Sequence, residues 1–467
     1  MDIIQILNYL FMFYSITIIS IYFSMCIVSL FVIKKYKKTN DSININTILA
    51  SGDAEPSVTI IASSFNESPT IIPCVISLLN LEYNNYEVIV VNDGSTDDSL
   101  EKVITEFNLE KIDYIVNYKI ETKKIRGIYK SKNPIYRNLI IIDKENGGKA
   151  DAMNAGINIS SKFYIVCVDV DSILRKDGLL KLIKSIISNK DSYITAVGAT
   201  VCAINACKVE NGVITEENVP NKFIPAIQII EYLRAFLMGR IALGKIKSLI
   251  LVSGAIGMFK KDNVLSIGGY DEKSIGEDME LIVRIRKYLY ENETSHNVDY
   301  IPDPLLWTEV PSTYKILGRQ RTRWARGLVD TLRLHKYMLF NKKYKTVGFI
   351  SFPYFVFFEW LTAFIEMTGL VYMIILFVLE IASVKSFLIV FLALYLFNIS
   401  LSYAAILLNE VSYHSYGKPK NMIKLLFFTL FEAIIFHPIT VYWTLKGNYM
   451  YLRGVKEWGV MTREGFK

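Results

Sequence analysis

Two aspartates in the stretch CVDVDSIL, Asp169 and Asp171, have the spacing to hold a divalent cation. They follow an apolar run typical of a buried strand, and alternate residues of an extended chain share one face. Two close carboxylates repel each other unless a cation neutralises them, and Mg²⁺ or Mn²⁺ commonly binds carboxylates together with the phosphate oxygens of a ligand. DxD pairs are also common in plain loops, so the position at a strand end is what favours a metal and phosphate site.

Three further polar residues stand where other apolar runs end. Asp93 in VNDGSTDDS and Glu67 in SSFNES have carboxylates suited to a nucleobase or ribose, although such residues also form Asx turns and helix caps. Lys149 follows a glycine pair in ENGGKADAMNAG, which suits a diphosphate but also fits a plain connection between strand and helix. The glycine spacing matches neither a Walker loop nor the dinucleotide fingerprint, so ATP hydrolysis and NAD binding lose support.

An acidic pair, Glu277 and Asp278 in SIGEDMEL, begins an amphipathic helical pattern that runs to about residue 289. Acids are favoured in the first turn of a helix by the macrodipole, so helix capping is one interpretation. The other is that Asp278 is a general base that takes a proton from an attacking hydroxyl group.

The stretch GRQRTRWARGL, residues 318–328, places four arginines around one tryptophan. It fits a nucleic-acid or lipid patch, a solvated helix face, or a cradle for a phosphorylated substrate. If the stretch is helical, Gln320, Arg323 and Trp324 share one face, because they are spaced i, i+3 and i+4. Arg319 and Arg326 would then face elsewhere, where anionic lipid is one candidate ligand.

The elements that must position these residues are predicted from alternating apolar patterns between 56 and 340. Short β-branched runs alternate with helical stretches there, which predicts an α/β domain with a mainly parallel sheet. The runs are VTIIAS (58–63), YEVIVVND (86–93), LIIIDKE (139–145) and FYIVCVDVD (163–171). Ligands of such sheets bind beyond the carboxyl ends of the strands, where these candidate residues stand.

The rest of the chain predicts membrane segments, because its 52% hydrophobic content exceeds the usual soluble share of about 45–50%. Residues 8–33 form an uncharged anchor, and the following KKYKK places the next domain in the cytoplasm, at the plasma membrane. Residues 347–446 hold three or four further helices, since 347–381 fits either an interfacial helix with one span or a hairpin of two. That count decides the side of the tail, 447–467, whose basic residues favour the cytoplasm.

Charge and cysteine content exclude other classes of protein. The net charge of +7 accompanies 45 acidic residues, so a dedicated nucleic-acid binder is not indicated. The five cysteines and four histidines show no zinc spacing, which favours a reduced, cytosol-facing domain.

The motifs VNDGS, GGKADAMN, DVD, GED and QRTRW, in this order and flanked by membrane segments, resemble the membrane-embedded family-2 glycosyltransferases. That family includes cellulose, hyaluronan and poly-N-acetylglucosamine synthases. The resemblance implies a GT-A fold between one N-terminal and three or four C-terminal transmembrane helices. It also implies inverting, processive polymerisation of a UDP-activated sugar, UDP-glucose or UDP-N-acetylglucosamine, into a β-linked exopolysaccharide that crosses the plasma membrane.

The resemblance also implies roles for individual residues. Glu67 and Asp93 would contact uridine, and Lys149 would lie near the diphosphate. Asp169 would bind nucleotide and, with Asp171, hold Mg²⁺ or Mn²⁺. The catalytic base would be Asp278, and the motif that contacts substrate in processive synthases would comprise Gln320, Arg323 and Trp324.

The partners implied are the UDP-sugar donor, the growing polysaccharide acceptor, the lipid bilayer and an accessory export or regulatory subunit, with no nucleic acid. Two alternatives stay open at this point. One is transfer of a single sugar to a lipid phosphate or other membrane acceptor, and the other is a membrane receptor or channel with an inactive domain.

Overall fold

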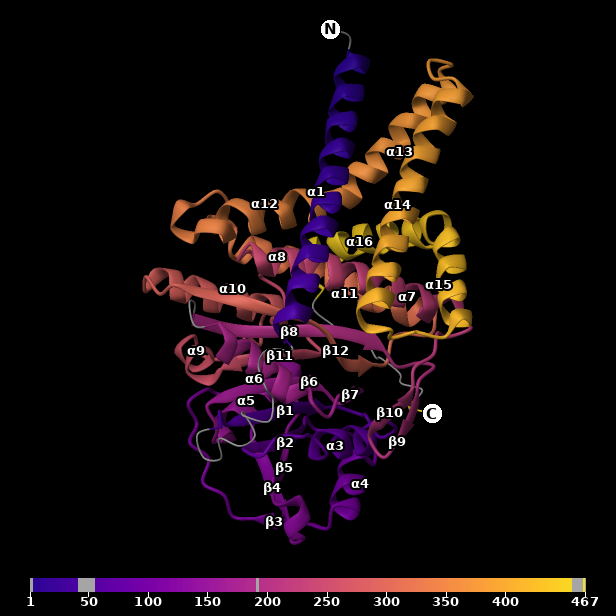
Figure 1. Ribbon diagram of the computed structural model, residues 1–467. Coiled ribbons are helices and arrows are strands. Elements are labelled where there is room, and N and C mark those ends of the chain that lie inside the picture. The colour runs from indigo at the N-terminus through magenta and orange to yellow at the C-terminus, as the bar shows by residue number, and fades with distance from the viewer. Residues whose placement is uncertain (1–2, 41–54, 190–192, 456–464, 467) are drawn as a thin grey trace.

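The computed structural model describes residues 3–40, 55–189, 193–455 and 465–466. An α/β domain carries a group of apolar helices that rise from one side of it (Figure 1). Most of the expected linker, 41–54, and most of the expected C-terminal tail, 456–464, lie outside the described residues.

The domain is built on a ten-stranded sheet with the order β3-β4-β5-β2-β1-β6-β11-β8-β12-β7. Its centre, β5-β2-β1-β6, is parallel, and β8 also pairs in parallel with β12. The mainly parallel α/β sheet expected from the β-branched runs is therefore confirmed at this centre. The strands are β1 (Val58–Ser64), β2 (Tyr86–Asn92), β3 (Leu109–Ile112), β4 (Ile125–Ser131), β5 (Leu139–Lys144), β6 (Tyr164–Asp169), β7 (Ser172–Leu174), β8 (Tyr193–Ala203), β11 (Ile256–Lys260) and β12 (His296–Thr308), and β9 (Lys208–Glu210) and β10 (Val213–Glu216) form a separate hairpin.

The helices of the domain pack apolar faces against this sheet. Helix α5, for example, lies against β1 and β2, and its Gly156 meets Ile61 so closely that a side chain there would overlap it. The helices are α3 (Ile71–Leu79), α4 (Ser99–Glu106), α5 (Lys149–Ile159), α6 (Gly178–Ser188), α7 (Phe223–Leu233), α8 (Ile241–Lys245), α9 (Lys261–Ser266), α10 (Glu277–Glu291) and α11 (Tyr314–Leu334). Between α7 and α8, residues Arg234–Arg240 form a π-helical segment.

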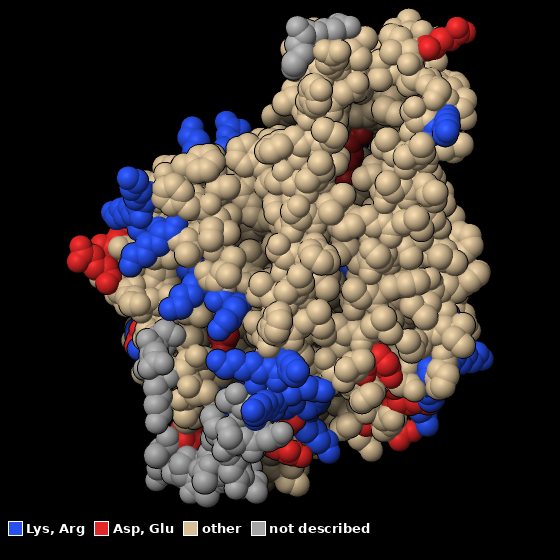
Figure 2. Space-filling view, turned by 45° about the horizontal axis from the view of Figure 1, so that its top comes forward, with Lys and Arg blue, Asp and Glu red and all other residues tan. Residues whose placement is uncertain are grey.

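In the described part of the chain, four helical segments are long and apolar enough to cross a membrane. They are Ile3–Lys38, Val347–Val378, Val384–Tyr413 and Pro419–Leu452. Three of them follow the domain, and the number that cross a membrane stays a prediction. Figure 2 shows a wide surface nearly free of charged side chains over these helices, bordered by lysines and arginines.

The segment Val347–Val378 is one continuous helical run, so a hairpin of two spans is excluded there. Its first part includes α12 (Phe352–Tyr354) and lies crosswise to α1 (Ile3–Asn40), whereas α13 (Thr362–Val378) rises beside α14 (Val384–Tyr413) (Figure 1). This arrangement agrees with the interpretation of an interfacial helix followed by one span.

The last apolar segment is bent. A π-helical turn, Glu432–Phe436, separates α15 (Pro419–Phe431) from α16 (His437–Leu452), and α16 packs along α11 of the domain. Beyond it, the backbone N–H of Gly465 donates a hydrogen bond to Glu309 over 3.2 Å. The C-terminal end therefore lies against the domain, while the N-terminal end lies at the far tip of α1 (Figure 1).

Candidate active site

The carboxyl ends of three parallel strands meet at one edge of the sheet. In the register of β1, Ser64 pairs with Asn92 of β2, and Ser63 pairs with Asp169 of β6. The residues that follow β1 and β2 therefore lie beside the end of β6. This register places the loops that carry Glu67 and Asp93 beside Asp169, as the sequence predicted.

Asp93 is buried and holds the glycine loop before α5. Its Oδ1 accepts hydrogen bonds from Lys144 Nζ at 2.6 Å and from the Gly147 N–H at 3.0 Å, and its Oδ2 accepts one from the Gly148 N–H at 2.8 Å. Burial raises the pKa of Asp93 even though these hydrogen bonds lower it. Gly148 has a φ of 90°, which favours glycine, so Asp93 and this glycine together fix the turn that precedes Lys149.

Glu67 takes part in the start of α3. Its backbone N–H donates to Ser99 Oγ at 3.1 Å, and its Oε2 accepts from Thr70 Oγ1 at 3.1 Å. The structure thus gives both Glu67 and Asp93 a structural role, and the contact with uridine stays a prediction for each.

Lys149, the first residue of α5, lies between two of the candidate carboxylates. Its Nζ is 2.8 Å from Asp169 Oδ1 and 4.0 Å from Asp278 Oδ1, and it donates to the Gly254 carbonyl at 3.1 Å. Burial lowers the pKa of Lys149, but the charges of Asp169, Asp278 and Glu277 outweigh it and raise the pKa above its usual value. The site therefore contains a fixed cation among acidic groups.

The two aspartates of the DxD pair have different surroundings. Strand β6 ends at Asp169 and the chain turns before β7, so the strand alternation that would align both side chains does not continue to Asp171. Asp169 has a side chain that is 30% exposed, whereas Asp171 is 4% exposed and its Oδ1 accepts from Ser172 Oγ and Thr308 Oγ1, each at 3.1 Å.

The DxD pair suits a divalent cation whose remaining ligands come from a bound substrate. The partly exposed carboxylate of Asp169 is a hard oxygen donor of the kind Mg²⁺ and Mn²⁺ prefer. No group of three or more His, Cys, Asp or Glu side chains with metal-binding placement occurs among the described residues. A cation held here would complete its coordination with water and with phosphate oxygens of a ligand, as is usual for Mg²⁺.

Asp278 and Glu277 begin α10 directly after Gly276. Asp278 has a side chain that is 29% exposed, and it lies so close to Gly254 that a Cβ there would overlap its carboxylate. Glu277 is buried, and burial followed by the charge of Asp278 raises its pKa to about 7 despite the opposing charges of Lys149 and Arg323. The carboxyl of Asp278 is thus reachable, while that of Glu277 keeps its proton to a higher pH than an ordinary glutamate.

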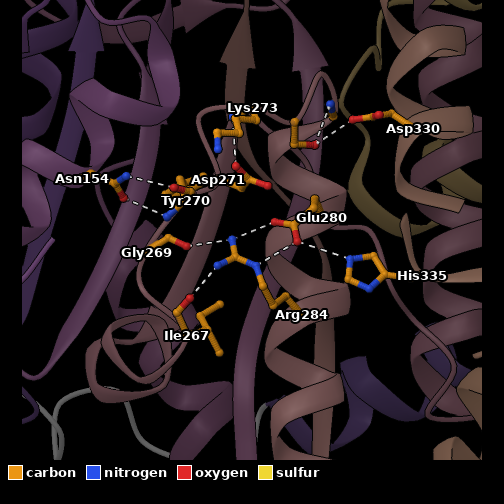
Figure 3. Close-up of polar contacts among 12 residues, drawn as sticks. Asn154, Ile267, Gly269, Tyr270, Asp271, Lys273, Glu280, Arg284, Asp330 and His335 are labelled. Carbon is orange, nitrogen blue, oxygen red and sulfur yellow. Dashed lines mark hydrogen bonds and ion pairs between the residues drawn. The ribbon is translucent and has the colours of Figure 1, made fainter. Parts of the chain in front are cut away.

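Hydrogen bonds to neighbouring helices fix the loop that leads to Gly276 (Figure 3). Asn154 of α5 bonds both the N–H and the carbonyl of Tyr270, at 2.8 and 2.9 Å. Asp330 of α11 accepts from the Ile275 N–H at 3.1 Å, and Tyr451 of α16 donates to the same carboxylate at 3.2 Å. These positioning residues were missed from the sequence, because no motif or spacing connects them to Asp278.

Helix α11 carries the QRTRW stretch and contacts the start of α10. A Cβ on Gly327 would lie 2.9 Å from the Cα of Gly276, so only two glycines allow this close approach. Trp324 is 42% exposed, and the guanidinium of Arg321 lies 4.2 Å from its ring centroid while pairing with Glu231 at 2.6 Å.

The remaining residues of this stretch divide between two helix faces, as their spacing predicted. The charge of Arg323 reaches Glu277, and Gln320 is half-buried one turn before Trp324. Arg319 is exposed on another face, where Arg326 is buried and donates to the Val455 carbonyl at 2.8 Å.

Comparisons with known proteins agree with this geometry. A family model described as glycosyltransferase like family 2 matches residues 56–327, more than half of the chain. The poly-beta-1,6-N-acetyl-D-glucosamine synthase of Staphylococcus epidermidis is 27% identical over 310 residues, which cover 64% of this chain and 63% of that protein. The synthase of the same description from Staphylococcus aureus strain COL is 26% identical over 310 residues, with the same coverage of both chains. The match thus spans less than two thirds of the length of these relatives.

A solved structure shows the same fold. A mannosyltransferase from Pyrobaculum calidifontis, in complex with GDP-Man and Mn²⁺, has a TM-score of 0.51 at 15% identity, covering 90% of this chain and 98% of its own. The GT-A fold expected from the sequence is therefore confirmed.

Proposed function

The chain belongs to glycosyltransferase family 2, and from that premise we propose that it polymerises N-acetylglucosamine from UDP-N-acetylglucosamine into a β-linked polysaccharide. The observation that carries the proposal is the position of Lys149 between Asp169 and Asp278. The sequence left the sugar open between glucose and N-acetylglucosamine. The names of the staphylococcal relatives favour N-acetylglucosamine and a β-1,6 linkage.

In the proposed reaction, Asp278 takes the proton from the acceptor hydroxyl group. The acceptor oxygen forms a bond to the anomeric carbon of the donor as the bond from that carbon to the diphosphate breaks, and UDP leaves with the electron pair. Attack opposite the leaving group inverts the anomeric carbon, so an α-linked donor gives a β-linkage. Lys149 supplies a fixed positive charge close to the position where negative charge develops.

Asp169, with Asp171 behind it, would hold Mg²⁺ or Mn²⁺ together with the donor diphosphate. When bound, this cation neutralises charge on the leaving diphosphate. Asp93 would act mainly by fixing the loop before Lys149, since several groups of the chain already bind its carboxylate. Contacts of Glu67 and Asp93 with uridine remain part of the proposal.

The acceptor end of the polymer would stack on Trp324, whose exposed ring already carries the guanidinium of Arg321 on one face. A flat aromatic surface suits a sugar ring, because it binds the apolar face of the ring without fixing its hydroxyl groups. Gln320 and Arg323 share a side of α11 with Trp324 by their spacing, and the charge of Arg323 acts on Glu277 of α10. This placement supports repeated addition at one site.

Export of the polymer through the apolar helices is part of the same proposal. Ionisable side chains within membrane segments are costly and usually mark a path for polar substrates. A series of ion pairs leads from α11 into these helices: Arg321–Glu231, Arg234–Glu432 and Glu366–His437. Figure 2 also shows a hollow in the apolar surface with an acidic side chain at its bottom.

The orientation that we propose places the domain, expected over 56–340, in the cytoplasm at the plasma membrane. The lysines at the end of α1 favour this side. Because Gly465 contacts Glu309 of the domain, the C-terminal end would lie on the same side. α1, α13 and α14 would then cross the membrane, while the bent segment of α15 and α16 would return to the domain. An accessory export or regulatory subunit stays a prediction.

The test is to supply the purified full chain with UDP-N-acetylglucosamine or UDP-glucose, each with Mg²⁺ or Mn²⁺, and to measure UDP release and product length. The proposal expects UDP release and long polymer with UDP-N-acetylglucosamine. A lipid-linked single sugar as the only product would replace polymerisation by single-sugar transfer, and no UDP release with either donor would contradict the enzymatic proposal.

A further inference from the structure

An arginine of the same helix supports the exposed ring of Trp324 on α11. Arg321 and Trp324 are three residues apart in this helix, so their side chains are neighbours on its surface. The guanidinium carbon of Arg321 lies over the ring, 4.2 Å from its centroid. Such a planar cation over an indole is a favourable cation–π contact. Because the ring is still 42% exposed, the guanidinium covers one of its faces and leaves the other open to a ligand.

The position of this guanidinium is set by Glu231 of α7. Arg321 Nη2 donates to Glu231 Oε2 over 2.6 Å, which is the one hydrogen bond of this guanidinium in the described part of the chain. The side chains of Arg321 and Glu231 are only 11% and 22% exposed. Burial raises the pKa of Glu231, and the charge of Arg321 opposes that rise. Since a charge-assisted bond with little access to water is costly to break, Glu231 should fix the place of Arg321 on the ring.

Helix α7 is itself connected to both α11 and the apolar helices. The buried Gln228 donates from Nε2 to the Pro311 carbonyl at 2.8 Å, shortly before α11 begins. Arg234, directly after α7, donates from Nη1 to Glu432 Oε2 at 3.2 Å. Glu231 lies three residues from each of these contacts, and α7 also packs against α14 and α15. The carboxylate that holds Arg321 is therefore fixed relative to α11 and to the apolar helices.

We propose that Glu231 and Arg321 are positioning residues for the acceptor, which hold Trp324 so that the terminal sugar of the polymer stacks on its open face. This inference rests on the proposed function, in which Trp324 binds the acceptor. An exposed tryptophan that is not held can populate several side-chain rotamers, and selecting one of them on binding weakens affinity. The pair removes this cost before the sugar arrives. Its loss should therefore weaken acceptor binding and leave donor binding unchanged.

The experiment compares the full chain with Glu231→Gln, Arg321→Gln and the double variant. Tryptophan fluorescence is titrated with a β-1,6-linked N-acetylglucosamine oligosaccharide, and the signal of Trp324→Phe is subtracted as background. UDP binding is measured by calorimetry on the same proteins. Glu110→Gln is the matched control, because it breaks an exposed ion pair with Lys132 at the far edge of the sheet.

Each single variant should raise the Kd for the oligosaccharide by about tenfold, as expected for one charge-assisted hydrogen bond, with native Kd for UDP. The control should bind both ligands as the native chain does. The double variant should bind the oligosaccharide no more weakly than Arg321→Gln, because Glu231 acts through Arg321. Product length with UDP-N-acetylglucosamine should fall in the same variants, while the KM for the donor stays native.

Native oligosaccharide affinity in both single variants would overturn the inference. A parallel loss of UDP affinity would overturn it as well, since it would indicate a general structural defect. Fully multiplicative losses in the double variant would show that Glu231 does not act through Arg321. Failure of the native chain to bind the oligosaccharide would remove the acceptor role of Trp324 and the inference with it. Absence of UDP release, with the expected pattern of oligosaccharide binding, would instead contradict only the proposed transfer.

Discussion

The Nζ of Lys149 lies 2.8 Å from Oδ1 of Asp169, and the same amino group lies 4.0 Å from Oδ1 of Asp278. One lysine thus connects the carboxylate at the end of β6 with the carboxylate at the start of α10. These two residues are more than one hundred positions apart in the chain, and their sequence motifs predict a different role for each. Their shared contact with Lys149 is what makes them one candidate site.

Removing this cation should therefore impair transfer. We expect Lys149→Met to lower kcat for UDP release by about 10²–10³-fold, the usual effect of losing one group that stabilises a transition-state charge. Steady-state kinetics with UDP-N-acetylglucosamine would measure it. Lys124→Met, at an exposed position of the same domain, is the control and should keep native kinetics. Native kinetics for Lys149→Met would contradict the role assigned to Lys149.

Glu277 should make stability depend on pH. Because burial and Asp278 raise its folded pKa to about 7, the folded protein binds more protons than the unfolded chain between about pH 4.5 and 7. The free energy of unfolding then falls as the pH rises through this window, by up to about 3 kcal/mol. Glu277→Gln removes that loss, so its Tm should exceed that of the native protein more at pH 8 than at pH 5. An equal Tm difference at both pH values would show that Glu277 is not responsible.

The contact between Gly276 and Gly327 should be sensitive to one methyl group. A Cβ on Gly327 would meet the Cα of Gly276 at 2.9 Å, so Gly327→Ala has to move α11 away from Asp278, at a cost of about 1–3 kcal/mol. We expect kcat to fall at least about tenfold, since small displacements of catalytic groups are costly. Gly239→Ala is the matched control, because its Cβ meets only a carbonyl oxygen at 3.9 Å. If both variants behave alike, close approach of the helices does not matter for transfer.

Asp330 should act by positioning the loop before Asp278, together with Tyr451 of α16. Asp330→Asn weakens the acceptor for the Ile275 N–H. Tyr451→Phe removes only the hydroxyl group that donates to the Asp330 carboxylate. Each should lower kcat by about tenfold with little change in donor KM, consistent with about 1–3 kcal/mol for an unmade buried hydrogen bond. The double variant should lose less than the product of the two effects, because both side chains share one hydrogen bond. Fully multiplicative losses would indicate that the two residues act independently.

The parallel centre of the sheet could be predicted because each of its strands is a short β-branched run between turn formers. The ends of β1, β2, β5 and β6 lie within two residues of the predicted runs. Strand β12 could not be predicted in this way, since Pro302 and Pro304 argue against a strand. The structure accommodates Pro304 through register shifts in the pairing with β8.

The candidate site could be predicted only in part, because some of its residues are placed by local patterns and others by long-range packing. Strand ends and helix starts identified Asp169, Lys149 and Asp278, because local patterns place polar residues at those points. The buried position of Asp171 depends on where β6 stops, and the role of Asp330 depends on packing between distant helices. Long-range packing of this kind leaves no signal in the local pattern of a single sequence.

Asp278 is proposed as the base of a sugar transfer, and the variant Asp278→Asn separates this role from donor binding. Asparagine has nearly the same shape, so it should fit beside Gly254 and leave the donor site intact, but it cannot take a proton. UDP binding by calorimetry and UDP release should be measured together, with Asp262→Asn at an exposed position as the control. We expect native UDP binding without detectable transfer. Loss of UDP binding, or transfer at the native rate, would show that Asp278 is not the base.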